Sequence, residues 1–184
     1  MKPDVGETIA PSEVRVVHRG RVFTVQVESL TLPSGHHLDA EIVRHPGSVV
    51  IVPITAAGEV VLVRQYRPAI GRSAWELPAG GLKPGEVPDA AAIRECHEET
   101  GLIPSRVEAL GAFFPTPGYC DELMHFYLAT DLHSPQPGDA IAQPDEDEDI
   151  TARTFSTATL QQMVRAGEII DLKTVAGLAL ARSR

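Results

Sequence analysis

Residues 80–102 read GGLKPGEVPDAAAIRECHEETGL, and this stretch decides how the chain is expected to fold. The segment from Asp89 to Thr100 is rich in Ala and Glu and favours a helix, and Gly101 is placed to end it as a left-handed cap. At about 100° per residue, one stripe of this helix is apolar: Ala92, Ile93 and Cys96. Three carboxylates share a narrow arc beside that stripe: Glu95, Glu98 and Glu99. The helix is therefore expected to be anchored by one face and to present acids on the next.

The three glutamates have two interpretations, a metal site and a solvated helix face. Glu95 and Glu99 stand at i,i+4, where like charges cost a few tenths of a kcal/mol in an isolated helix. A bound cation would reverse the sign of that interaction. Carboxylate oxygens suit Mg²⁺, with Mn²⁺ as a substitute, because both ions prefer oxygen ligands and share phosphate oxygens with a substrate. By themselves, three glutamates at this spacing are more often a solvated acidic surface.

The residues around the glutamates favour the metal site. Gly80 is followed after five residues by Glu86 and after seven more by Arg94-Glu95, and the pattern then continues through Glu98-Glu99 to Gly101. An apolar residue is expected after Glu95, where Cys96 stands, and after Gly101, where Leu102 stands. This is identified as a complete Nudix box, a pattern that arises by chance on the order of once in 10⁸ to 10⁹ starting points. The chain therefore resembles the Nudix hydrolases.

The resemblance assigns roles within the box. It implies that metal is held by Glu95, Glu99 and the carbonyl of Ala79, with Glu98 nearby. Glu98 and Arg94 complete the catalytic set, and Arg94 can pair with acidic neighbours to hold them in register. Gly80 is expected to permit a tight loop before the helix.

Matches outside the box resemble the bacterial ADP-ribose pyrophosphatases. Pro117-Gly118 lies sixteen residues after Gly101, where similar enzymes for ADP-ribose carry a proline, although an ordinary Pro-Gly turn has the same sequence. The stretch 63–68 reads VRQYRP and holds two arginines, whose planar fork can bind phosphate oxygens. The resemblance assigns Arg67 to the substrate and also implicates Arg64, which could equally be a solvated surface residue.

An acidic run, PDEDED at residues 144–149, on its own is more often a disordered loop. In similar enzymes a loop of this kind brings a glutamate over the metal. The resemblance therefore implies that Glu146 is the general base and Glu148 an auxiliary metal ligand. A slip of one acidic position in the alignment would exchange the two roles.

The first 45 residues favour a small β-rich appendage, followed by a catalytic domain at 46–184. Alternation from Phe23 to Glu28 indicates a half-buried strand, and Leu38 to Arg44 can return beside it. The resemblance implies that this appendage binds the adenosine half of the substrate through Val22, Phe23 and Glu41, partly from a neighbouring subunit. The resemblance thereby implies a homodimer, and the sequence supports this only indirectly, because so small a sheet cannot form a core alone.

The remaining elements mix strands with helices. Residues 49–54 and 60–63 are β-branched runs that favour a hairpin or meander, and 109–114, 123–129 and 150–155 favour further strands. Two helices are expected to close the chain, one capped by Ser156 or Thr157 and one by Asp171. This pattern predicts an α+β fold, which the resemblance narrows to a Nudix-type α/β/α sandwich with a mixed sheet.

Composition excludes several classes of function. With 184 residues and 43% apolar content, the chain suffices for one domain with a small appendage, and its formal charge of −9 argues against nucleic-acid binding. Neither a signal peptide nor a membrane-spanning run is apparent, so a cytoplasmic protein is expected. Cys96 and Cys120 form no C-x-x-C pair, so neither a zinc site nor a disulfide is expected.

The expected activity is Mg²⁺-dependent hydrolysis of the small molecule ADP-ribose to AMP and ribose 5-phosphate. One alternative activity is hydrolysis of another nucleotide sugar, such as GDP-mannose. The same metals would act on its diphosphate, and the contacts to the base would differ. Another is a non-catalytic nucleotide-sugar sensor, which predicts a damaged box, whereas every acidic position of this box is intact.

Overall fold

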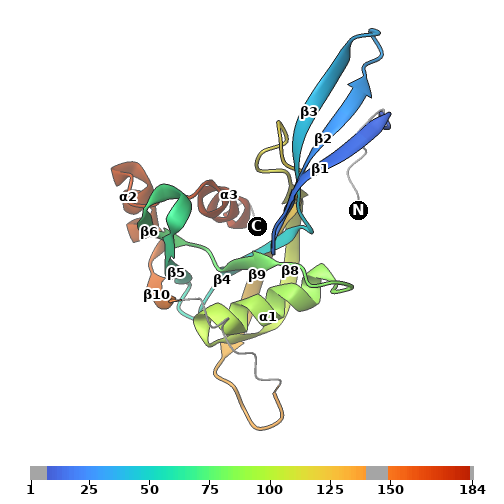
Figure 1. Ribbon diagram of the computed structural model, residues 1–184. Coiled ribbons are helices and arrows are strands. Elements are labelled where there is room, and N and C mark those ends of the chain that lie inside the picture. Colours follow the sequence, from blue (N-terminus) through green and yellow to red (C-terminus); the bar gives the residue numbers. More distant parts are fainter. Residues whose placement is uncertain (1–7, 140–148, 183–184) are drawn as a thin grey trace. The chain divides into compact units, whose positions relative to one another are not determined.

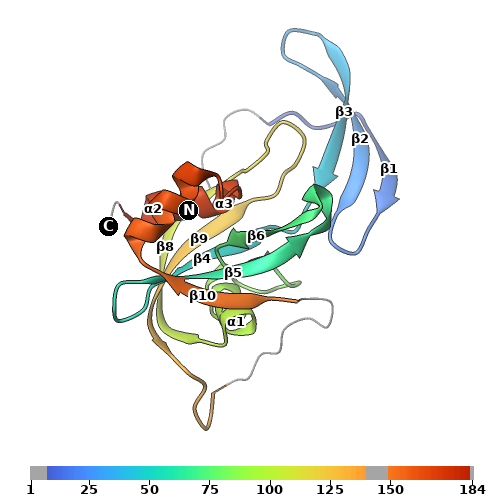
Figure 2. The ribbon, with the colours of Figure 1, turned by 90° about the vertical axis from the view of Figure 1, so that its left-hand side faces the viewer.

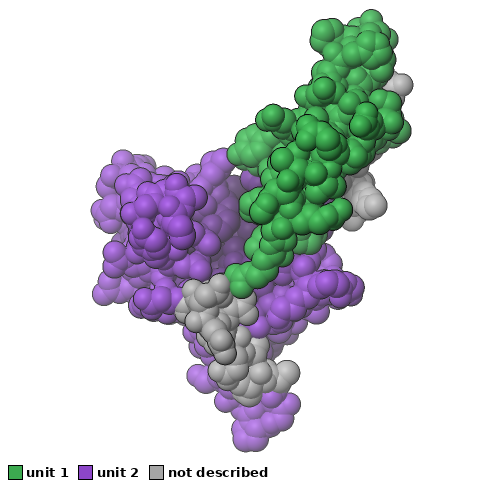
Figure 3. Space-filling view, in the orientation of Figure 1, with its two compact units in different colours: residues 1–46, 116–122 green, residues 47–115, 123–184 purple. Residues whose placement is uncertain are grey.

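The computed structural model describes residues 8–139 and 149–182 of the chain and divides into two compact units (Figure 3). Unit 1 comprises Met1–Pro46 and Thr116–Glu122, and unit 2 comprises Gly47–Pro115 and Leu123–Arg184. The segment Thr116–Glu122 joins unit 1 because the backbone N–H of Val43 donates to the carbonyl of Tyr119 at 2.7 Å. Each unit is described by itself below.

Unit 1 is a three-stranded antiparallel sheet (Figure 1). Its strands are β1 (Glu13–Arg19), β2 (Thr24–Thr31) and β3 (His37–Arg44), in the order β1-β2-β3. A turn from Leu32 to His36 joins β2 to β3, where Gly35 adopts a φ of 82° that favours glycine. Arg44 pairs with the buried Glu28 and, at 3.0 Å, with Asp121. This pairing ties the segment Thr116–Glu122 to the end of β3.

Unit 2 contains two sheets. The larger is mixed: β7 (Ala79–Gly81), β4 (Ser48–Pro53), β9 (Met124–His133) and β8 (Ile103–Phe113), in that order, with only β4 and β9 parallel. The smaller is antiparallel: β10 (Thr151–Phe155), β5 (Val60–Arg67) and β6 (Arg72–Glu76). A short 3₁₀ helix, η1 (Pro68–Ile70), joins β5 to β6.

The hairpin, one of the two arrangements expected for residues 49–54 and 60–63, is not formed, although both runs are strands. Only an isolated bridge links Ile54 to Val60, because β4 and β5 enter different sheets. The turn between them is nevertheless tight, with the Gly58 N–H donating to the carbonyl of Thr55 at 2.9 Å. Apolar runs predict strands well, but they do not state which strand pairs with which.

Helices cover both faces of β4 (Figure 2). Val49 and Ile51 pack in one cluster with α1 (Pro88–Thr100), whereas Val50 and Val52 pack in another with α2 (Thr157–Ala166) and α3 (Leu172–Ala181). Alternate residues of a strand point to opposite faces, so β4 separates two helical layers. The predicted α+β sandwich with a mixed sheet is confirmed.

Local signals set the ends of the helices as expected. Gly101 ends α1 in the left-handed region at φ 72°, and its N–H donates to the carbonyl of His97. The Ser156 hydroxyl and the Asp171 carboxylate cap α2 and α3 by accepting from the backbone N–H groups of Thr159 and Thr174. No helix in the described part of the chain is long and apolar enough to cross a membrane.

The N-terminal end of α1 is fixed by a contact to β9. The buried Tyr127 donates its hydroxyl to Asp89 Oδ1 at 2.5 Å. Burial and the neighbouring carboxylate both raise the pKa of Tyr127 above its usual value, so the phenol stays a donor. Because the cap residue Val87 has no polar side chain, this contact helps to hold the first turn of α1.

Candidate active site

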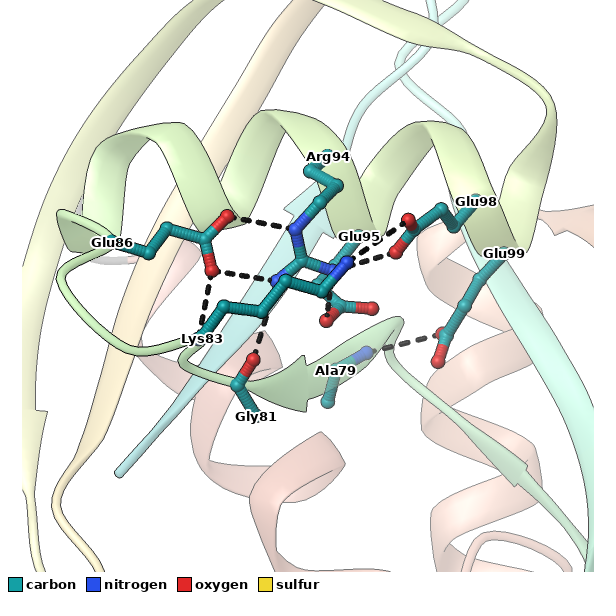
Figure 4. A network of polar contacts seen from close by, with 8 residues as sticks. All are labelled: Ala79, Gly81, Lys83, Glu86, Arg94, Glu95, Glu98 and Glu99. Atoms are coloured by element: carbon teal, nitrogen blue, oxygen red, sulfur yellow. Dashed lines mark hydrogen bonds and ion pairs between the residues drawn. The ribbon is translucent and has the colours of Figure 1, made fainter. Parts of the chain in front are cut away.

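Arg94 lies at the centre of an acidic cluster beside α1 (Figure 4). Its guanidinium donates to both oxygens of Glu86 at 2.7 and 2.8 Å, and to one oxygen each of Glu95 and Glu98 at 2.6 Å. It also reaches the carbonyl of Gly81 at 3.2 Å. Arg94 therefore holds three carboxylates of the box in register, as the sequence predicts.

The pairing with Arg94 changes how Glu86 titrates. Hydrogen bonds from Arg94, together with the N–H of Lys83, lower the pKa of Glu86 from 4.5 to about 2. Glu86 thus stays ionised at any ordinary pH. Its task in the cluster is to balance the charge of Arg94 on the side away from Glu98.

Glycine is required at position 80 for a reason other than the tight loop that the sequence suggested. It lies in β7 opposite Val49, and a Cβ built there would come 2.1 Å from the carboxyl carbon of Glu95. The backbone at Gly80 needs no left-handed φ, so the expected tight loop is not what requires glycine. Gly80 is required because the carboxylate of Glu95, only 8% exposed, packs directly against its backbone.

Glu99 and Ala79 are also in contact. The backbone N–H of Ala79 donates to Glu99 Oε2 at 3.1 Å, so β7 and the last turn of α1 are joined beside Glu95. Glu99 is only 7% exposed. Glu98 is held by Arg94 and lies 3.7 Å from the ammonium of the exposed Lys83.

The donor chemistry of the cluster fits a hard divalent cation. Four carboxylates (Glu86, Glu95, Glu98 and Glu99) face the two cations Arg94 and Lys83, which leaves an excess of two negative charges. Within residues 8–139 and 149–182, however, no three His, Cys, Asp or Glu side chains converge as a metal-ligand set. In this part of the chain Arg94 donates to Glu95 and Glu98, and Glu99 accepts from the N–H of Ala79. The arrangement is an ion-pair cluster rich in oxygen donors.

A second charged network precedes the box. Glu76, 2% exposed at the end of β6, accepts two hydrogen bonds from Arg67, Nε to Oε1 at 2.9 Å and a terminal nitrogen to Oε2 at 2.7 Å. It also pairs with Lys173 of α3, which lies 3.0 Å from Asp171. Burial opposes ionisation of Glu76, but Arg67 and Lys173 outweigh it and hold its pKa below the usual value.

Sequence reasoning missed three members of this network: Glu76, Lys173 and Asp171 in its role as an ion-pair partner. Glu76 stands two residues before Pro78 in the stretch 75–80, WELPAG, and a charge in so apolar a strand end was a usable signal. The sequence offered no such signal for Lys173, because this residue lies 97 positions after Glu76.

The remaining predicted residues belong to β5, to unit 1 or to the part of the chain that is not described. Arg64 is exposed on β5 opposite Trp75. Several belong to unit 1, where Val22 and Phe23 are 51% and 43% exposed: Val22, Phe23, Glu41, Pro117 and Gly118. Glu146 and Glu148 lie outside the described residues.

Comparison with known proteins decides the family, because residues 44–174 match the NUDIX domain. The chain belongs to the NUDIX family. A protein of Bacillus subtilis (strain 168) named "ADP-ribose pyrophosphatase" is 34% identical over 174 residues, which cover 95% of this chain and 91% of that protein. The "Methanol dehydrogenase activator" of Bacillus methanolicus is 38% identical over 159 residues, which cover 86% and 84%.

A solved structure described as "Crystal structure of ADP compounds hydrolase" superimposes with a TM-score of 0.81 over 96% of this chain and 94% of that chain. At 24% identity it establishes the shared fold. Together with the family match, these relationships confirm the expected Nudix pyrophosphohydrolase. Nudix hydrolases generally use divalent metal ions, in agreement with the donor chemistry of the cluster.

Proposed function

We propose that this Nudix enzyme hydrolyses the diphosphate of ADP-ribose to AMP and ribose 5-phosphate with Mg²⁺, and that Mn²⁺ can substitute. The observation that carries the proposal is the acidic cluster beside α1, which is complete at every box position and in which Glu95 packs against Gly80. The choice of ADP-ribose is supported by the Bacillus subtilis relative, which shares 34% of residues over nearly the whole chain.

The metal would be held by Glu95, Glu99 and the carbonyl of Ala79, with Glu98 beside them and Glu148 as an auxiliary ligand. When bound, Mg²⁺ would polarise the diphosphate and lower the pKa of the attacking water. The excess of negative charge around Arg94 supports these assignments, because it favours a cation in the cluster. Arg94 keeps Glu95 and Glu98 in place, and Glu146 would accept the proton of the attacking water.

Arg67 would bind the phosphates. Two of its five N–H donors are used by Glu76, and its side chain is 39% exposed, so the remaining donors can reach an anion. The bidentate pair with Glu76 fixes the plane of the guanidinium before substrate arrives, which lowers the entropy cost of binding. Arg64, on the same strand, would add positive charge.

Unit 1 would bind the adenosine half and pair two subunits in the cytoplasm. β1 exposes Val14, Val16 and Val17 at 48%, 38% and 55%, although a three-stranded sheet needs a covered face to be stable. A second copy would supply that cover. Val22, Phe23 and Glu41 would then contact adenine, and Pro117-Gly118 the terminal ribose.

A substrate screen with Mg²⁺ tests the proposal. ADP-ribose, GDP-mannose, NADH and diadenosine polyphosphates are compared by initial rate, with sedimentation velocity on the same sample to measure the subunit count. We expect kcat/KM to be tenfold to a hundredfold higher for ADP-ribose than for GDP-mannose. Guanine carries a carbonyl where adenine carries its amino group, so a protein acceptor buried against the base would stay unpaired, at a cost of about 1 to 3 kcal/mol. Equal or inverted kcat/KM values would refute ADP-ribose as the preferred substrate and favour GDP-mannose. No turnover of any substrate would favour a sensor.

A further inference from the structure

A cavity of about 410 Å³ lies in unit 2 on the α2 and α3 side of the sheet. Its apolar lining comes from β4, β5, α2 and α3, and includes Val52, Val60, Leu160, Val164, Val175 and Leu178. Its volume falls within the range of about 300 to 1,000 Å³ that is typical of small-molecule sites. The cavity can therefore hold a small apolar ligand.

The cavity is separate from the acidic cluster of α1. Val52 of β4 lines it, whereas the preceding residue, Ile51, packs with α1 on the opposite face of the same strand. None of Glu86, Arg94, Glu95, Glu98 and Glu99 is among the lining residues. The sheet thus stands between the cavity and the box.

The polar part of the lining is cationic. Two arginines, Arg165 at the end of α2 and Arg182 after α3, lie beside the neutral Thr157 and Gln161, and the lining contains no carboxylate. Neither guanidinium makes a hydrogen bond or ion pair with another residue in the described part of the chain. In a chain with a formal charge of −9, two arginines beside an apolar cavity select for an anionic group.

We propose that this cavity binds an amphipathic anion, an apolar chain that carries one carboxylate or phosphate. The apolar chain occupies the space among Leu160, Val164 and Leu178, and the anionic head lies at Arg165 and Arg182. Burial of the apolar chain supplies most of the binding free energy, because it removes apolar surface from water. The arginines supply selectivity for charge and fix the direction of the ligand.

Ligand binding should also stabilise the fold. Val175 and Leu178 line the cavity from α3, the helix whose first turn holds Glu76 and Leu77 through Lys173 and Thr174. A ligand that contacts both α2 and α3 binds the folded chain only. Its binding must therefore raise the melting temperature in a concentration-dependent way.

Decanoate, below its micellar concentration, is the probe, and the full-length protein is titrated by calorimetry and by thermal unfolding. We expect saturable binding and a rise in Tm. Decyl phosphate should act similarly, because its head is also anionic, and a higher affinity for one of the two identifies the preferred head group. Decanol should bind about tenfold more weakly, since it lacks the charge-assisted hydrogen bonds, and decyltrimethylammonium more weakly still.

Two variants locate the site. Ala179→Trp fills the cavity from an exposed lining position and should abolish decanoate binding. The double variant Arg165→Gln/Arg182→Gln, both at exposed positions, should equalise decanoate and decanol without lowering the Tm of the free protein. Arg106→Gln, an exposed arginine of β8 outside the cavity, is the matched control and should bind as the wild type does.

Two results would overturn the proposal. One is a failure of the wild-type protein to bind decanoate or decyl phosphate at millimolar concentration. The other is a preference for decanoate over decanol that survives in the double arginine variant. The second result does not depend on Ala179→Trp, so it would overturn the proposal even if that variant fails to fold.

Discussion

The backbone N–H of Leu77 donates to the hydroxyl of Thr174 at 2.8 Å, across 97 positions of sequence. Thr174 is fully buried, and its hydroxyl donates in turn to Asp171 Oδ2 at 2.5 Å. The first turn of α3 is thereby fixed against the strand end that leads into Ala79 and Gly80. Part of the geometry of the box therefore depends on a helix near the other end of the chain.

Thr174→Val should destabilise the protein. Valine has nearly the same shape, but it leaves the buried N–H of Leu77 without an acceptor, at a cost of about 1 to 3 kcal/mol. Urea unfolding followed by circular dichroism measures the change. Thr151→Val, at an exposed position of β10, is the control and should be near neutral. An equal effect of the two variants would contradict the role of the Thr174 hydroxyl.

Gly80→Ala should reduce activity far more than Gly81→Ala. A Cβ at Gly80 would meet the carboxyl of Glu95 at 2.1 Å, whereas a Cβ at Gly81 meets no atom within 4 Å. Glu95 must then swing away, and we expect a loss of roughly tenfold to a hundredfold in kcat/KM. Initial rates at saturating Mg²⁺ measure it. Parallel behaviour of the two variants would show that the contact of Glu95 with Gly80 does not matter for catalysis.

Glu99→Gln should keep the fold and lose most of the activity. The amide oxygen of glutamine can still accept from the N–H of Ala79, so the link between α1 and β7 survives while the negative charge is removed. We expect a loss of roughly a hundredfold in kcat/KM with little change in Tm. Glu168→Gln, an exposed position, is the control and should do little. Near-normal turnover of Glu99→Gln at saturating Mg²⁺ would show that Glu99 is not a metal ligand.

Glu146→Gln should lower kcat far more than it changes KM, because a general base acts mainly in the transition state. The comparison is with Glu148→Gln, whose loss should be partly recovered by raising Mg²⁺ if this residue is a metal ligand. Steady-state kinetics over a range of Mg²⁺ separates the two. A larger kcat loss in Glu148→Gln would mean that the roles are exchanged.

The stabilisation that Glu86 provides should depend on pH. Its pKa is lowered from 4.5 to about 2 in the folded protein, so the folded state favours the ionised form. The contribution is fully present above the unfolded value of 4.5 and is lost as pH falls toward the folded value of about 2. Unfolding free energies of the wild type and Glu86→Gln should therefore converge over that interval. A difference that stays constant with pH would show that Glu86 is not held ionised by Arg94.

Much of the fold could be predicted from short stretches of sequence. The helix expected over Asp89–Thr100, which begins one residue earlier at Pro88, follows from periodicity and from the left-handed cap at Gly101. Side-chain chemistry predicts the cap at Asp171 and one at Ser156 or Thr157, of which the structure has Ser156. The pairing of strands could not be predicted in this way. β4 and β5 are neighbours in sequence but enter different sheets, because the choice depends on burial against distant elements.

The sequence by itself determined the acidic arc of the Nudix box, because helical spacing places Glu95, Glu98 and Glu99 on one side of α1. Only the tertiary structure decided how these acids are held. Glu95 of α1 packs against Gly80 of β7, and Glu76 pairs with Arg67 of β5 and with Lys173 of α3. Such contacts join residues that no local pattern relates, because burial and ion pairing act between side chains that only the folded chain brings together.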